Sequence, residues 1–144
     1  MIPFADPSAS YQKHKVEIDH AIGRVLNSGS YVLGEEVKAF ENEFAIFHGQ
    51  NFHAVGVANG TDAIALSLRS LGLENGDEVI TPSHTAIATV AGIEQAGCNP
   101  VFADIDPISR CIDPNSVERR IGPKTRSIMP VNDFIYGKFI TNVG

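Results

Sequence analysis

The segment VGVANGTDAIALSL, residues 55–68, joins a short apolar run to a helical pattern, with only Asn59 and Gly60 between them. The apolar residues before Asn59 predict a buried strand, and the apolar residues at helical spacing after Thr61 predict a helix. A strand that passes directly into a helix is the building unit of α/β proteins. The segment therefore indicates an α/β fold, and it places a polar Gly-Thr pair at the strand-to-helix junction.

The same alternation continues along the chain as far as residue 131. Short apolar runs predict strands, and longer patterns ending in glycine or beginning with Asp-Pro predict helices. The expected strands are residues 53–58, 78–81, 100–105 and 126–131, and the expected helices are residues 61–72, 85–97 and 113–121. Strand-helix-strand repetition predicts parallel strands with right-handed crossovers, hence a layered α/β domain.

Two amphipathic helices are expected before the first strand. Apolar residues at helical spacing predict one over residues 8–28, with Gly29 as its stop, and one from Glu35 to Gly49 whose apolar face carries three phenylalanines. The linker between them, SGSYVLG at residues 28–34, contains the aromatic Tyr31.

Composition narrows the class of protein. The chain has 144 residues, 43% of them hydrophobic and 19% charged, which fits a soluble globular domain or one piece of a larger one. A net charge of −6 with scattered basic residues argues against a nucleic-acid or membrane-surface partner. No apolar run approaches the ~20 residues of a membrane span, and the start lacks a secretory signal pattern, so a cytoplasmic location is expected.

Metal and disulfide chemistry is not indicated. Cys98 and Cys111 have no metal or redox spacing and are expected to be small buried or half-buried side chains. The five histidines form no H-x-x-x-H pair, so no metal site is predicted.

Three strand-to-helix junctions carry candidate site residues, because ligands of α/β sheets collect at the carboxyl ends of strands. At the first, Gly60 and Thr61 open a helix and form either a phosphate-sized anion site or a plain helix cap. At the second, His84 stacks on an aromatic ring or transfers protons, or is a solvated loop residue. At the third, Asp104 and Asp106 suggest metal or acid–base chemistry, but a turn cap before Pro107 is favoured.

Taken in order, these segments resemble the DegT/DnrJ/EryC1/StrS sugar aminotransferase family. The resemblance runs through MIPFADPSASY, VLNSGSYVLGEEVKAFENEFAIFHG, AVGVANGTDAIALSLRSLGLENGDEVITPSHTAIATVAGIEQAGCNPVFADIDP and CIDPNSVERRIGPKTRSIMPV, about residues 2–131. It implies pyridoxal 5'-phosphate as cofactor and the N-terminal part of a fold-type-I large domain, an incomplete αβα sandwich with a mostly parallel sheet. It also implies amino transfer from glutamate or glutamine to a nucleotide-linked keto-sugar, in polysaccharide or amino-sugar biosynthesis, by a homodimer.

By the same resemblance, Gly60 and Thr61 bind the cofactor phosphate through their amides and the Thr61 hydroxyl. The family's ring-stacking aromatic falls at Ala86 here, which leaves His84 as the candidate for that role. Tyr31 lies in a loop that approaches substrate in the family, although a packed linker aromatic explains it as well.

The resemblance also implies that two catalytic residues of the family are not among residues 1–144. The family's Schiff-base lysine and the aspartate that pairs with the pyridinium nitrogen fall after residue 144, so no catalytic residue is assigned and no turnover is expected from residues 1–144 alone. Residues 1–131 are expected to form the N-terminal segment with part of the cofactor-binding domain, and residues 132–144 a divergent tail. Two alternatives stay open: a pyridoxamine-phosphate-dependent sugar dehydratase of the same family, and a non-catalytic remnant.

Overall fold

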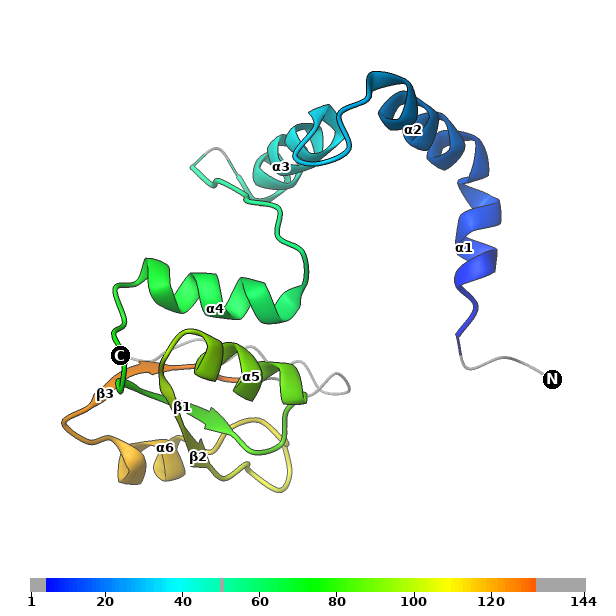
Figure 1. The fold of residues 1–144 in the computed structure, drawn as a ribbon. Coiled ribbons are helices and arrows are strands. Elements are labelled where there is room, and N and C mark those ends of the chain that lie inside the picture. Colours follow the sequence, from blue (N-terminus) through cyan, green and yellow to red (C-terminus); the bar gives the residue numbers. More distant parts are fainter. Residues whose placement is uncertain (1–4, 50, 132–144) are drawn as a thin grey trace. The chain divides into compact units, whose positions relative to one another are not determined.

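A computed structural model of the chain describes residues 5–49 and 51–131 (Figure 1). By their internal contacts the residues fall into two compact units, divided between Gly56 and Val57. The expected tail at residues 132–144 lies outside the described residues. Within the described ranges, no helix is both long and apolar enough to span a membrane.

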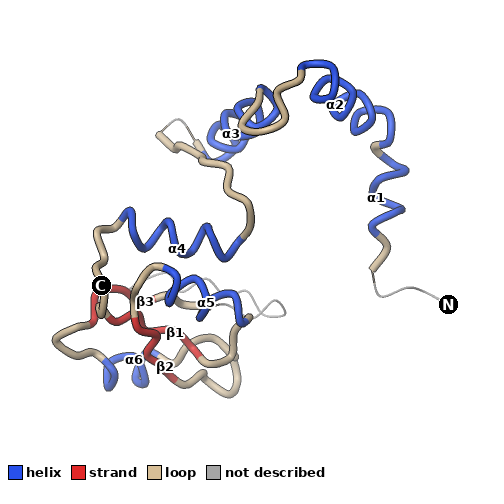
Figure 2. The backbone as a smooth tube through the Cα atoms, viewed as in Figure 1, coloured by secondary structure: helices blue, strands red, loops and turns tan. Residues whose placement is uncertain are grey.

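The first unit is helical. It contains α1 (Pro7–Lys13), α2 (Lys15–Ser28) and α3 (Glu35–His48) (Figure 2). The single helix expected over residues 8–28 is interrupted at His14, whose φ of −114° and ψ of 18° leave the helical range. Gly29 ends α2 in the left-handed conformation, which glycine adopts without steric cost. Arg24 of α2 donates to both carboxylate oxygens of Glu36 on α3, at 2.6 and 3.0 Å.

The second unit is a three-stranded parallel sheet flanked by helices. Its elements are α4 (Gly60–Ser70), β1 (Glu78–Pro82), α5 (Ile87–Gln95), β2 (Asn99–Ala103), α6 (Pro114–Arg120) and β3 (Thr125–Ile128). The strands lie in the order β2-β1-β3, and both pairings are parallel, as the sequence predicted.

Two small cores on opposite faces of β1 make the sheet the middle layer of three (Figure 1). Val79 points into the first core, with Ala65 and Leu68 of α4 and Ile93 of α5. The next residue, Ile80, points into the second core, with Val117 of α6. Because successive side chains of a strand alternate between faces, α4 and α5 cover one face and α6 the other.

One expected strand is wrong. Residues 53–58 form no strand, and the described part of the chain has three strands where four were expected. The amide of Gly56 donates to the side chain of Glu41 at 2.7 Å, where a strand would donate to a neighbouring carbonyl. An apolar run becomes a strand only when a partner strand accepts its backbone hydrogen bonds.

The local signals for α6 are confirmed. Asp113 is its N-cap and accepts from the amides of Asn115 and Ser116 at 3.0 and 3.2 Å, and Pro114 occupies the first turn. Both features follow from the free amides at a helix start, which need an acceptor or a residue without an N–H group.

Candidate functional site

The first turn of α4 presents backbone amides without acceptors. Asn59 caps the helix: its carbonyl accepts from the amide of Ala63 at 3.1 Å, and its side-chain oxygen accepts from the amide of Asp62 at 2.9 Å. Among the described residues, no acceptor is recorded for the amides of Gly60 and Thr61 or for the Thr61 hydroxyl. Such amides, with the positive end of the helix dipole behind them, favour an anion.

The space beside Gly60 is open. A methyl group added at Gly60 would meet no described atom within 4 Å. The glycine therefore leaves room over the first turn where a phosphate group can approach the backbone. The residues here fit the phosphate of the cofactor that the resemblance implies: two free amides, a free hydroxyl and no side chain in the way.

Asp62 places a carboxylate in the same turn, and two amide side chains hold it. Asn59 Nδ2 donates to Asp62 Oδ2 at 2.9 Å. Gln95 Nε2, from the end of α5, donates to Asp62 Oδ1 at 3.2 Å. Each carboxylate oxygen of Asp62 thus accepts from a neutral donor.

Gly92 on α5 permits close packing against the same turn. A methyl group at Gly92 would lie 2.7 Å from Ile64 Cγ2 and 2.9 Å from the carbonyl oxygen of Thr61. Sequence reasoning missed the contribution of Gly92 and Gln95 to this site. The one available signal was a glycine inside a helical pattern, which often marks a close approach.

The structure does not join His84 to this turn, and Tyr31 belongs to the other unit. His84 is exposed in the loop between β1 and α5, and no hydrogen bond or ring contact links it to Gly60 or Thr61 in the described ranges. Tyr31 lies in the linker between α2 and α3, 66% exposed, in the first unit. The turn beside His84 is ordered by a hydrogen bond of 2.7 Å between the hydroxyls of Thr85 and Thr89.

The turn-cap prediction for the aspartate pair is confirmed for Asp106. Its Oδ1 accepts from the amides of Ile108 and Ser109, at 3.1 and 2.6 Å. The hydrogen bonds from Ser109 are the main cause that lowers the pKa of Asp106. Asp104 is exposed, and the described residues contain no cluster of three His, Cys, Asp or Glu able to hold a metal.

Both cysteines are buried, as predicted. Burial raises the pKa of the Cys98 thiol, which keeps it protonated and unreactive.

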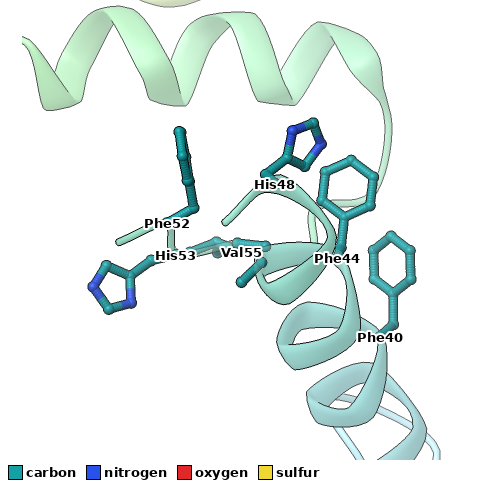
Figure 3. Close-up of a pocket in the computed structure, with 8 residues that line it drawn as sticks. Phe40, Phe44, His48, Phe52, His53 and Val55 are labelled. Carbon is teal, nitrogen blue, oxygen red and sulfur yellow. The ribbon is translucent and has the colours of Figure 1, made fainter. Parts of the chain in front are cut away.

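A separate pocket of about 360 Å³ lies in the first unit, beside α3 (Figure 3). The rings of Phe40 and Phe44 are 5.5 Å apart, and that of His48 is 4.6 Å from Phe44. Its lining contains no lysine or arginine and is mainly aromatic and apolar, including Phe40, Phe44, His48, Phe52, His53 and Val55. It therefore offers a phosphate neither a lysine nor an arginine.

The fold is thus that of an α/β protein with a parallel sheet, and the first turn of α4 has the free amides that can bind an anion. The family model of the DegT/DnrJ/EryC1/StrS aminotransferase family matches residues 12–142. The chain belongs to this family.

Two curated relatives illustrate the similarity. The chain is 46% identical to the dTDP-3-amino-3,4,6-trideoxy-alpha-D-glucose transaminase of Streptomyces venezuelae, over 94% of the chain and 35% of that protein. It is 41% identical to the UDP-2-acetamido-2-deoxy-3-oxo-D-glucuronate aminotransferase of Pseudomonas aeruginosa, over 96% of the chain and 38% of that protein. The chain thus spans about a third of the length of the relatives it matches.

Solved structures agree in fold. S. venezuelae DesV, in complex with a ketimine intermediate, gives a TM-score of 0.84 at 46% identity, over 90% of this chain and 34% of that one. NtdA from Bacillus subtilis, with bound cofactor PMP, gives a TM-score of 0.76 at 34% identity, over 82% of this chain and 27% of that one. The E. coli GDP-4-keto-6-deoxy-D-mannose-3-dehydratase, with bound hydrated PLP, gives a TM-score of 0.66 at 32% identity, over 77% of this chain and 30% of that one. The fold is that of the N-terminal part of a fold-type-I aminotransferase large domain.

Proposed function

We propose that this chain provides the cofactor-phosphate site of a pyridoxal-phosphate-dependent aminotransferase. The enzyme would transfer an amino group from glutamate or glutamine to the keto group of a nucleotide-linked sugar, in polysaccharide or amino-sugar biosynthesis. Support comes from the relatives, which are named as transaminases of dTDP- and UDP-linked sugars. The observation that carries the proposal is the open first turn of α4, with two free amides beside a glycine.

Gly60 and Thr61 would hold the phosphate. Their amides and the Thr61 hydroxyl have no acceptor among the described residues, so three donors are ready without breaking an internal bond. The helix dipole adds a favourable field for a dianion at this end of α4. When bound, pyridoxal phosphate supplies the electron sink for amino transfer. Gly60 and Thr61 would bind its phosphate and so orient the cofactor.

The remaining assignments extend the same proposal. His84, at the carboxyl end of β1, would stack on the pyridine ring, because the aromatic position of the family is Ala86 here. Tyr31 would approach the substrate, and the enzyme would act as a cytoplasmic homodimer. Residues 1–131 would then contribute the N-terminal segment and part of the cofactor-binding domain, with residues 132–144 as a divergent tail.

A second candidate is a pyridoxamine-phosphate-dependent sugar dehydratase of the same family. The similarity to the GDP-4-keto-6-deoxy-D-mannose-3-dehydratase favours it. An assay with ¹⁵N-glutamate and a nucleotide-linked keto-sugar separates the two activities. Nitrogen label in the sugar product supports the aminotransferase, and loss of a sugar hydroxyl without label supports the dehydratase.

Replacing Gly60 tests the phosphate site directly. The substitution Gly60→Ala adds a methyl group where no described atom lies within 4 Å, so the free energy of unfolding should stay equal or rise by up to about 1 kcal/mol. The same methyl group would occupy the space of a bound phosphate. We expect affinity for pyridoxamine 5'-phosphate, measured by isothermal titration calorimetry, to fall at least about tenfold, or about 1.4 kcal/mol.

Gly23→Ala is the matched control, because a methyl group at Gly23 also meets no described atom within 4 Å. Gly23 belongs to α2 and not to the proposed phosphate site on α4. It should leave binding unchanged. Equal affinities of the wild type and Gly60→Ala would exclude the first turn of α4 as the phosphate site. Absence of binding by the wild type would favour the non-catalytic alternative.

A further inference from the structure

The end of α5 meets the first turn of α4 at two points. Gly92 brings the helix backbone close to the carbonyl of Thr61, and Gln95, one turn later on the same face, donates to the Asp62 carboxylate at 3.2 Å. These contacts link residues about 30 positions apart in the chain. They reach the turn that carries the free amides of Gly60 and Thr61.

The Asp62 carboxylate is the unfavourable group in a phosphate site. A carboxylate in the first turn competes with an external anion in two ways. It can fold back toward the free amides at the helix start, where a negative charge is favoured, and its charge repels a phosphate dianion. Its position therefore decides whether the turn is available to a ligand.

In this structure both carboxylate oxygens are engaged elsewhere. Oδ2 accepts from Asn59 Nδ2 at 2.9 Å, and Oδ1 accepts from Gln95 Nε2 at 3.2 Å. Asn59 lies in the cap itself, whereas Gln95 reaches in from α5. Gln95 is thus the donor that draws the carboxylate toward the neighbouring helix.

We propose that Gln95 is a positioning residue for the phosphate site, which holds the Asp62 carboxylate against α5 so that the amides of Gly60 and Thr61 stay free for the ligand. The inference rests on the proposed function, since it concerns the same site. Gln95 itself does not touch the phosphate and acts through Asp62.

The contact between the helices does not depend on the Gln95 side chain. The Arg69 guanidinium of α4 donates to the main-chain carbonyl of Gln95, and that bond persists whatever the side chain at position 95. The side chain is exposed. The substitution Gln95→Met keeps the length and neutrality of the side chain and removes the amide group that donates to Asp62. It should leave the thermal midpoint of unfolding within about 2 °C of wild type.

The test compares pyridoxamine 5'-phosphate with pyridoxamine, which lacks the phosphate, by calorimetry on the protein that contains this chain. Neither compound has an aldehyde, so neither reacts with surface lysines. For Gln95→Met we expect about fivefold weaker binding of the phosphate compound, which is the size of one typical net hydrogen-bond contribution, and unchanged binding of pyridoxamine. Glu94→Gln, at the adjacent exposed position, is the control and should change neither.

A double substitution provides a rescue. Asp62→Asn with Gln95→Glu reverses the donor and acceptor of the pair, keeps the net charge, and moves the carboxylate from α4 to α5. The new Asn side chain can still accept from Asn59 and donate to the new Glu side chain. We expect phosphate-dependent affinity within about twofold of wild type or tighter.

The outcomes separate this inference from the proposed function. An affinity advantage of the phosphate compound that is about fivefold smaller in Gln95→Met, and equal to that of wild type or larger in the double variant, supports the positioning role. An unchanged ratio of the two affinities, or an equal loss for both compounds, overturns it while leaving the proposed site in place. A wild type that binds neither compound overturns both.

Discussion

At the scale of single residues, Thr81 is the least explained group of the second unit. Its side chain is fully buried, and its hydroxyl has no hydrogen-bond partner among the described residues. It lies on β1 between Ile80 and Pro82, on the face that Val79 shares with α4 and α5. A buried hydroxyl without a partner costs free energy, because its bonds to water are lost and not replaced.

Thr81→Val tests this cost. Valine has nearly the same shape and no hydroxyl, so the free energy of unfolding should rise by about 1 kcal/mol. Urea denaturation followed by circular dichroism measures it. As a control, Thr89→Val removes a hydroxyl that does have a partner, Thr85 at 2.7 Å, and should lower stability. A loss of stability in Thr81→Val would show that its hydroxyl is satisfied in the folded protein.

At the scale of elements, the packing of α4 on α5 positions the candidate site. The two helices share the core that contains Leu68 and Ile93, and Gly92 lets their backbones approach at the first turn of α4. The apolar pattern of each helix determines which face it buries. The glycine determines how closely the two helices come together.

Gly92→Ala should open this contact. A methyl group at 2.7 Å from Ile64 and 2.9 Å from the Thr61 carbonyl cannot be accommodated without moving a helix. We expect the free energy of unfolding to fall by about 2 kcal/mol, despite the higher helix propensity of alanine. Affinity for pyridoxamine 5'-phosphate should fall with it, because the first turn of α4 moves.

Gly60→Ala serves as the comparison on the same helix pair, since it has room for the methyl group. It should weaken binding without lowering stability, whereas Gly92→Ala should do both. If Gly92→Ala were as stable as wild type in urea denaturation, the close approach of α4 and α5 would not exist in solution.

At the scale of the whole molecule, the two units differ in burial. None of the described residues of the first unit is buried, whereas the second has two cores around β1. Large apolar side chains of α2 and α3 are exposed, such as Ile22, Leu26 and Phe44. Helices without buried apolar faces gain little from packing and are marginal in water.

Hydrogen exchange measured by mass spectrometry should show this difference in the 144-residue chain. Amides of α2 and α3 should exchange at least about tenfold faster than those of β1 and α5, because local opening costs least where few apolar contacts break. Protection of α2 and α3 that rises with protein concentration would fit the proposed homodimer. Equal protection of both units at low concentration would contradict the expectation.

Much of the second unit was predictable from local patterns. The start of α4 after Asn59, the cap at Asp113 and the apolar run of β1 were all confirmed. Each depends on residues within one helical turn or one strand, so the sequence contains the whole signal. The free amides of Gly60 and Thr61 belong to this class, because every helix start leaves amides unpaired.

The sequence by itself thus determined the order and type of most elements and the helix start that carries the candidate site. Only the tertiary structure decided that residues 53–58 stay unpaired, and that Gln95 donates to Asp62 from a helix 33 positions away. The physical reason is the same in both cases. A strand needs a partner to accept its hydrogen bonds, and a carboxylate's surroundings depend on which distant element packs beside it; neither is encoded in the spacing of near neighbours.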